Sequence, residues 1–156
     1  MDEKLIVLNL DPLMQFACSH GRHADELTIV LKGHLVVEYM LDSIIKEKFK
    51  NPNKILSYSF YRILEILHSL GFLPDYLFKN IETLNKIRNK YAHDLKYSLD
   101  INELFVIDSD DKQITLSSKS KKYTKKSTIN SFCAVVIMQL HAHYLVKLGI
   151  NSPINW

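Results

Sequence analysis

Apolar side chains recur every three or four residues along most of this 156-residue chain, which is the spacing of the buried face of an amphipathic helix. The first such stripe spans residues 25–50. Pro52 ends it, because proline cannot donate the helical hydrogen bond and disfavours the helical conformation in the residue before it. A second stripe spans residues 54–70, and Gly71 follows it in position to adopt the left-handed cap conformation. The pattern therefore predicts two helices in the first half of the chain.

Two further helices are predicted in the second half. The third begins at Pro74, whose fixed φ suits a first helical turn, and runs to about His93. The last begins at Ser127 or Thr128, either of which can cap a helix, and runs to residue 148. This helix is apolar almost all round over residues 132–140, so we expect it in the centre of the core or in a subunit interface.

The periodicity changes between the third and the last helix. Residues 105–107 and 113–116 are short strand-like runs on either side of a polar Asp-Ser-Asp-Asp turn, which predicts a small β-hairpin. Four helices with short connections predict an all-α fold, an antiparallel four-helix bundle with this hairpin inserted before the last helix. The length fits a single domain over residues 1–156, in which the hairpin and the basic segment after it form an insertion at about residues 104–126.

Composition and targeting signals narrow the class of protein. A hydrophobic fraction of 47% with 24% charged residues is typical of a folded globular chain. The two cysteines, Cys18 and Cys133, are too few for a disulfide framework and lie in no zinc-ligand spacing, so no metal site is expected. The start of the chain lacks a basic segment followed by an apolar one, and no apolar run is long enough to cross a bilayer. We therefore expect a soluble, cytoplasmic protein.

Candidate chemistry gathers at the end of the third predicted helix. Arg88 continues the apolar line of that helix by one step, which places a permanently charged group on the packed side. Asn89 and His93 are four residues apart and share a face. A guanidinium presents fixed donors to phosphate oxygens, and an imidazole exchanges protons near neutral pH. The three residues thus have the parts for transesterification at a phosphodiester.

The segment that holds these three residues, Arg-Asn-x-x-Ala-His, resembles the R-x4-6-H motif of the HEPN superfamily of small all-helical dimers. The resemblance implies a homodimer whose two motif helices meet at a two-fold axis and line one RNA-cleaving cleft. It also implies that Arg88 stabilises the scissile phosphate, that His93 moves protons and that Asn89 orients one of the two. The ribose 2′-hydroxyl would be the nucleophile, so RNA would be cut and DNA would not. No metal or other cofactor is then required.

The resemblance extends to two groups of HEPN proteins with different functions. HEPN toxins paired with a nucleotidyltransferase antitoxin carry a tyrosine two residues after the histidine, where this chain has Leu95. The helical order and the motif are also similar to HEPN-like proteins grouped with the mannitol operon repressor, which regulate by binding. A toxin or defence ribonuclease with a cognate antitoxin or regulatory protein is one hypothesis, and a non-catalytic binding module is the other. A third is a scaffold in which Arg88 forms a salt bridge and His93 caps its helix.

Glu38 is a candidate supporting residue in the first predicted helix. It lies four residues after His34, within the apolar stripe, where an unpaired charge would be unfavourable. One interpretation is a structural polar pair of His34 and Glu38. The other is that Glu38 orients Arg88 or His93 without itself contacting the substrate.

Basic residues supply candidate RNA contacts, although the net charge of +3 permits a polyanionic partner without requiring one. Five lysines fall within residues 119–126, around a tyrosine that could stack on a base. The alternative is a solvated loop. The candidate RNA-binding residues are Lys90, Lys121, Lys122, Tyr123, Lys125 and Lys126.

Overall fold

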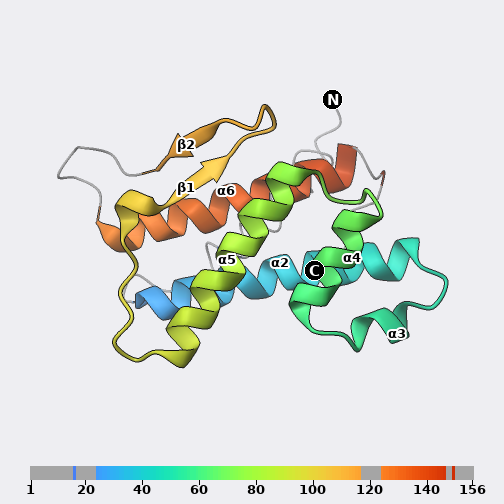
Figure 1. Cartoon of the computed structure of the whole chain (residues 1–156), viewed down its shortest axis with the longest axis horizontal. Coiled ribbons are helices and arrows are strands. Elements are labelled where there is room, and N and C mark those ends of the chain that lie inside the picture. Colours follow the sequence, from blue (N-terminus) through green and yellow to red (C-terminus); the bar gives the residue numbers. More distant parts are fainter. Residues whose placement is uncertain (1–15, 17–23, 117–123, 147–148, 150–156) are drawn as a thin grey trace.

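The computed structural model describes Phe16, residues 24–116, residues 124–146 and Gly149, and over these residues the fold is mostly helical (Figure 1). The elements in chain order are α2 (Glu26–Lys48), α3 (Pro52–Leu56), α4 (Phe60–Ser69), α5 (Asp75–His93), the 3-10 helix η1 (Ile101–Glu103), β1 (Phe105–Ile107), β2 (Gln113–Thr115) and α6 (Lys125–Val146). Within these ranges, no helix combines the length and the apolar character that crossing a membrane requires.

The long helices α2, α5 and α6 pack against one another, and α5 lies across the other two (Figure 1). Helix α4 packs on α5 and α2. The apolar stripes predicted from the sequence form the interior, and the last helix is central to it, as expected. Side chains buried from α2, α5 and α6 include Val37, Leu41, Ile44, Leu77, Ile81, Leu84, Phe132, Val136 and Leu140.

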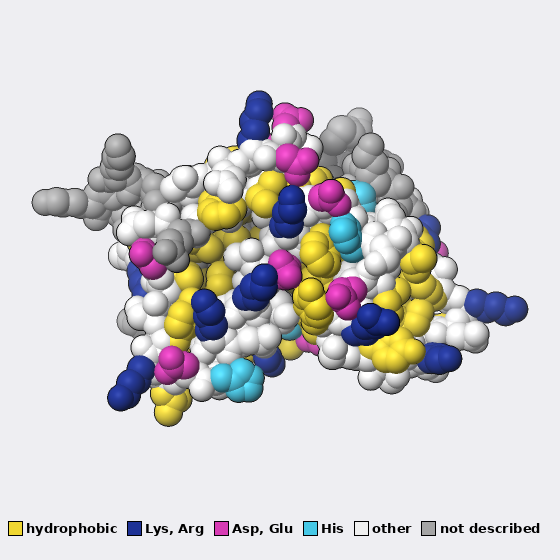
Figure 2. Space-filling view, in the orientation of Figure 1, with side chains coloured by type: hydrophobic (Ala, Val, Ile, Leu, Met, Phe, Trp, Pro, Cys, Tyr) yellow, Lys and Arg dark blue, Asp and Glu magenta, His cyan; other side chains and the backbone are white. Residues whose placement is uncertain are grey.

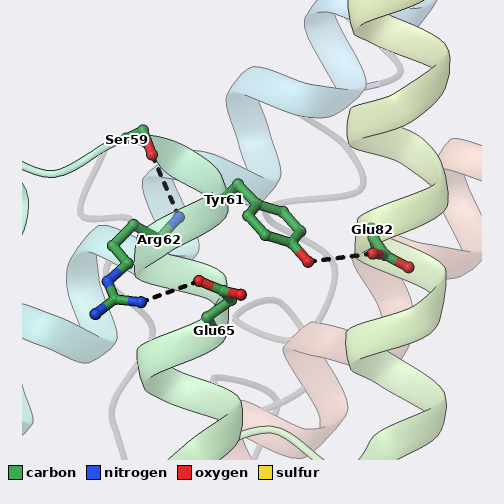
Figure 3. A network of polar contacts seen from close by, with 5 residues as sticks. All are labelled: Ser59, Tyr61, Arg62, Glu65 and Glu82. Atoms are coloured by element: carbon green, nitrogen blue, oxygen red, sulfur yellow. Dashed lines mark hydrogen bonds and ion pairs between the residues drawn. The ribbon is translucent and has the colours of Figure 1, made fainter.

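The predicted second helix over residues 54–70 is wrong in its continuity, because the structure has two helices there. Pro52 occupies the first turn of α3, and α4 begins only at Phe60. Between them, the Ser57 hydroxyl donates to the Lys54 carbonyl at 2.7 Å, and the Ser59 hydroxyl accepts from the Arg62 amide at 3.4 Å (Figure 3). Serine side chains that bond to nearby backbone compete with the helical pattern, and two of them close together break the helix here.

The predicted hairpin is confirmed: β1 and β2 are antiparallel, with Phe105 opposite Thr115. The Asp108 carboxylate accepts hydrogen bonds from the backbone amides of Asp110 and Lys112, both at 2.9 Å, and this side chain shapes the turn. Asp111 completes it with a φ of 58°, a left-handed conformation that Asp tolerates better than most residues.

Asn80 of α5 holds the hairpin against the helices. Its Oδ1 atom accepts from the Ile107 amide at 2.9 Å, and its Nδ2 atom donates to the Ile107 carbonyl at 2.8 Å. Gln139 of α6 donates to the same carbonyl at 2.9 Å. Both backbone groups of this strand residue are thereby satisfied at the surface of the bundle.

The last helix begins earlier than predicted. Ser127 and Thr128 lie inside α6, and the cap is Thr124, whose hydroxyl accepts from the Ser127 amide at 3.2 Å. Lys125 therefore belongs to the first turn of this helix. Thr124 is also a hydroxyl residue that can cap a helix, but the prediction did not name it, and helix ends are commonly misplaced by a few residues.

Candidate functional site

The Arg-Asn-x-x-Ala-His segment occupies the last turns of α5, which ends at His93 as predicted. This end of α5 crosses the first half of α2 (Figure 1). Arg88 and Asn89 are half-buried, whereas His93 is exposed. On the face shown in Figure 2, Lys and Arg side chains alternate with Asp, Glu and His, so they form no continuous basic patch.

Arg88 lacks a counter-charge among the residues that the structure describes. Its Nη1 atom donates to the Asn89 side-chain oxygen at 2.9 Å, but its Nε atom is buried without a hydrogen-bond partner. No described Asp or Glu lies within ion-pair distance of the guanidinium, so the salt bridge of the scaffold hypothesis is not found there. A half-buried guanidinium without a counter-charge favours an anion as its ligand.

His34 and Asn85 form a polar cluster where α2 and α5 cross, close enough to Arg88 for its charge to act on His34. The His34 Nε2 atom lies 3.1 Å from the Asn85 Oδ1 atom, and the His34 ring lies 4.2 Å from that of Phe60, between centroids. His34 and Asn85 are only 5% and 8% exposed, so this contact is shielded from water.

His34 is held in its neutral form by this environment. Burial lowers its pKa because low-dielectric surroundings disfavour the imidazolium, the Asn85 hydrogen bond opposes that effect, and the positive charge of Arg88 lowers the pKa further. An amide oxygen accepts but cannot donate, so the His34 proton sits on Nε2 and points at Asn85.

Glu38 reaches this cluster only through His34. Its carboxylate lies 4.0 Å from the His34 Nδ1 atom, which is too long for a hydrogen bond, and its side chain is 43% exposed. It has no hydrogen bond or ion pair with Arg88 or His93 in the described residues. Glu38 therefore lies beside His34 as predicted, but with a neutral imidazole the contact is neither a hydrogen bond nor an ion pair. Direct contact of Glu38 with Arg88 or His93 is not found in the described residues.

His93 stands apart from the other two motif residues. The last turn of α5 places it on the same face as Asn89, four residues earlier, but no hydrogen bond joins the two side chains in the described residues. The backbone amide of Asp94 closes the helix on the Lys90 carbonyl at 3.0 Å. The histidine is thus left open to solvent for contact with another molecule.

The candidate RNA-binding lysines differ in their surroundings. Lys90 is exposed, with its ammonium 5.4 Å from the centre of the Tyr97 ring. Lys125 pairs with the Glu26 carboxylate at 3.5 Å and donates to the Ser98 hydroxyl, so it has a structural role. Lys126 is exposed. The remaining candidates, Lys121, Lys122 and Tyr123, lie outside the described residues.

A pocket of about 330 Å³ opens beside the end of α5. It is lined by Asp25, Glu26, Leu27, Tyr91, Asp94, Leu95, Tyr97 and Lys126. Three carboxylates against one ammonium make the interior of this pocket unsuited to a phosphate. Among the described residues, no group of three or more His, Cys, Asp or Glu is arranged to hold a metal ion.

Asn85 is the residue of this site that sequence reasoning missed. The signal was an amide side chain between Leu84 and Ile87, inside the apolar stripe and one turn before Arg88. A polar residue buried in such a stripe needs a partner, and here it is His34.

Comparison of the chain with protein-family models, with curated proteins and with solved structures finds no match.

Proposed function

We propose that this chain is a metal-independent endoribonuclease of the HEPN type, which acts as a homodimer through Arg88, Asn89 and His93. The observation that carries the proposal is the half-buried Arg88 guanidinium, which has no counter-charge in the described residues and whose Nε atom is buried without a hydrogen-bond partner. The mostly helical fold is compatible with it: α2, α4, α5 and α6 would be the four helices of the bundle, with the motif at the end of one.

The chemistry follows from what each side chain can do. Arg88 binds a non-bridging oxygen of the scissile phosphate and offsets the charge that grows on it. A neutral imidazole removes the proton of the ribose 2′-hydroxyl, whose oxygen forms a bond to phosphorus as the bond from phosphorus to the 5′-oxygen breaks. An imidazolium gives a proton to that leaving oxygen. In a two-fold dimer, the His93 side chains of the two protomers supply the base and the acid.

The first test is cleavage of a labelled single-stranded RNA in EDTA by the wild type and by the Arg88→Ala and His93→Ala variants. The wild type should cleave, leaving a cyclic phosphate, and each variant should lose about a hundredfold or more in rate. An oligonucleotide with 2′-deoxyribose at every position should remain intact.

Arg62→Ala is the matched control for Arg88→Ala. Arg62 is also a helical arginine, but its guanidinium is 3.3 Å from the Glu65 carboxylate and its side chain is 64% exposed (Figure 3). This variant should cleave at the wild-type rate. Cleavage by Arg88→Ala at that same rate, or cleavage that depends on added Mg²⁺, would contradict the proposal.

The alternative is a non-catalytic HEPN module that regulates by binding, like the proteins grouped with the mannitol operon repressor. The observation that favours it is a set of exposed apolar side chains, of which Leu95 is fully exposed, Leu35 is 55% exposed and Met138 is 53% exposed. Expression in a bacterial host separates the two. A toxin halts growth as wild type but not as His93→Ala, whereas a binding module has the same effect on growth in both forms.

A further inference from the structure

Three side chains with hydrogen-bond donors form one row on α5. Asn85, Arg88 and Asn89 are three and four residues apart, so they project from the same side of the helix. Arg88 is a motif residue and Asn89 adjoins it, whereas Asn85 precedes the motif by one turn.

The oxygens of this row are all engaged within the protein. The Asn85 Oδ1 atom accepts from His34 Nε2 at 3.1 Å, and the Asn89 Oδ1 atom accepts from Arg88 Nη1 at 2.9 Å. The groups left over are the two amide nitrogens, which make no hydrogen bond with the described residues, and the Nε atom of Arg88, which is buried without a partner. The row therefore presents donors and no free acceptor.

The neutral His34 ring fixes which way the Asn85 amide faces. The ring is 5% exposed and packs on Phe60, so it cannot turn away from α5. With its Nε2 proton on the Asn85 oxygen, the amide nitrogen is the atom left for another partner. This nitrogen is not among the buried atoms that lack a partner, so part of its surface is open to a ligand.

We propose that Asn85 is a further phosphate-binding residue of the RNA site, and that His34 is the positioning residue that turns its amide donors toward the ligand. Phosphate oxygens carry lone pairs and no protons, so they match a row that has only donors. This inference rests on the proposed function for the identity of the phosphate, which is that of an RNA strand.

Asn85→Asp is the decisive variant because it changes donors into acceptors at almost constant shape. The carboxylate still accepts from His34, but it repels a phosphate. The probe is a fluorescent RNA oligonucleotide with 2′-deoxyribose at every position, which binds without being cleaved, and the measurement is fluorescence anisotropy in EDTA. We expect the Kd to rise about tenfold or more.

Asn53→Asp is the matched control, since it makes the same change in net charge at an exposed position of α3, far from the end of α5 (Figure 1). Its Kd should stay within about twofold of wild type.

His34→Leu tests the positioning role of His34. This variant loses the hydrogen bond to the Asn85 oxygen and should bind RNA more weakly. His34→Gln keeps a donor and should bind RNA more tightly than His34→Leu. Equal Kd values for Asn85→Asp and Asn53→Asp would overturn the inference.

The outcomes separate this inference from the proposed function. If the wild type cleaves RNA and the Asn85→Asp variant binds RNA like the control, the ribonuclease proposal is supported and the phosphate-binding role of Asn85 is contradicted. An inactive wild type whose binding is weakened by Asn85→Asp would support the phosphate site and contradict the ribonuclease.

If Asn85→Asp does not fold, an NMR measurement on the wild type replaces the binding assay. It follows the signal of the Asn85 side-chain amide. That signal should shift when the oligonucleotide is added, and an unshifted signal would refute the inference.

Discussion

The Tyr91 hydroxyl on α5 donates a 2.6 Å hydrogen bond to the Glu26 carboxylate at the start of α2. Lys125 at the start of α6 pairs with the same carboxylate at 3.5 Å. One acidic side chain thus joins three helices at the end of the molecule where His93 lies. The position of the motif depends on this junction because α5 ends two residues after Tyr91.

Removal of the Tyr91 hydroxyl should weaken that junction. Tyr91→Phe keeps the ring and loses a hydrogen bond to a charged acceptor, so the free energy of unfolding should fall by about 1 to 2 kcal/mol. Urea denaturation followed by circular dichroism measures this. Tyr58→Phe is the control, because Tyr58 is exposed and its hydroxyl has no hydrogen bond in the described part of the chain. Equal stability of the two variants would show that the bond contributes nothing.

Gly33 should tolerate no side chain, since α2 and α6 approach each other closely at this point. A Cβ atom added there would lie 2.8 Å from the Cys133 Sγ atom and 2.9 Å from its Cβ atom. Gly33→Ala should destabilise the protein by about 1 to 3 kcal/mol in urea unfolding. The destabilisation should be smaller when the same substitution is made in a Cys133→Ala background, which removes the sulfur. Destabilisation of the same size in both backgrounds would show that the sulfur is not the source of the strain.

Stability should fall as the pH drops below about 6.5, the usual pKa of histidine. The folded pKa of His34 is lowered, chiefly by burial, so between the folded and unfolded values the unfolded chain binds more protons. Protons then favour unfolding, by up to about 1.4 kcal/mol per pH unit for one histidine. Urea unfolding at several pH values from about 5 to 7.5 tests this, and His34→Gln should show a flatter dependence. A slope unchanged in His34→Gln would rule out His34 as the source.

The candidate lysines should separate into two kinds. Lys126→Gln, alone or combined with changes at Lys121 and Lys122, should weaken RNA binding and reduce the slope of log K against log salt by about one for each phosphate that the variant no longer neutralises. Lys125→Gln should instead lower stability, because Lys125 pairs with Glu26. Anisotropy over a range of salt concentrations and urea unfolding measure the two effects. An unchanged salt slope in the triple variant would indicate that these lysines contact water and not RNA phosphates.

The sequence by itself determined the elements whose signals are local. Apolar periodicity located α2, α5 and the core face of α6, and the polar turn between two apolar runs located the hairpin. The spacing of Arg88, Asn89 and His93 placed them in the last turns of one helix, and that helix ends where predicted. Such features depend on residues within a few positions of each other, so their patterns are visible in one dimension.

Only the tertiary structure decided which side chains acquire partners. The bond between His34 and Asn85 joins residues 51 positions apart, and it exists because α2 and α5 cross at that point. The same crossing leaves the Arg88 guanidinium half-buried and without a described counter-charge. Helix periodicity fixes which residues face inward, but the crossing angle and the register between helices fix what each of them meets, and these follow from packing of the whole core.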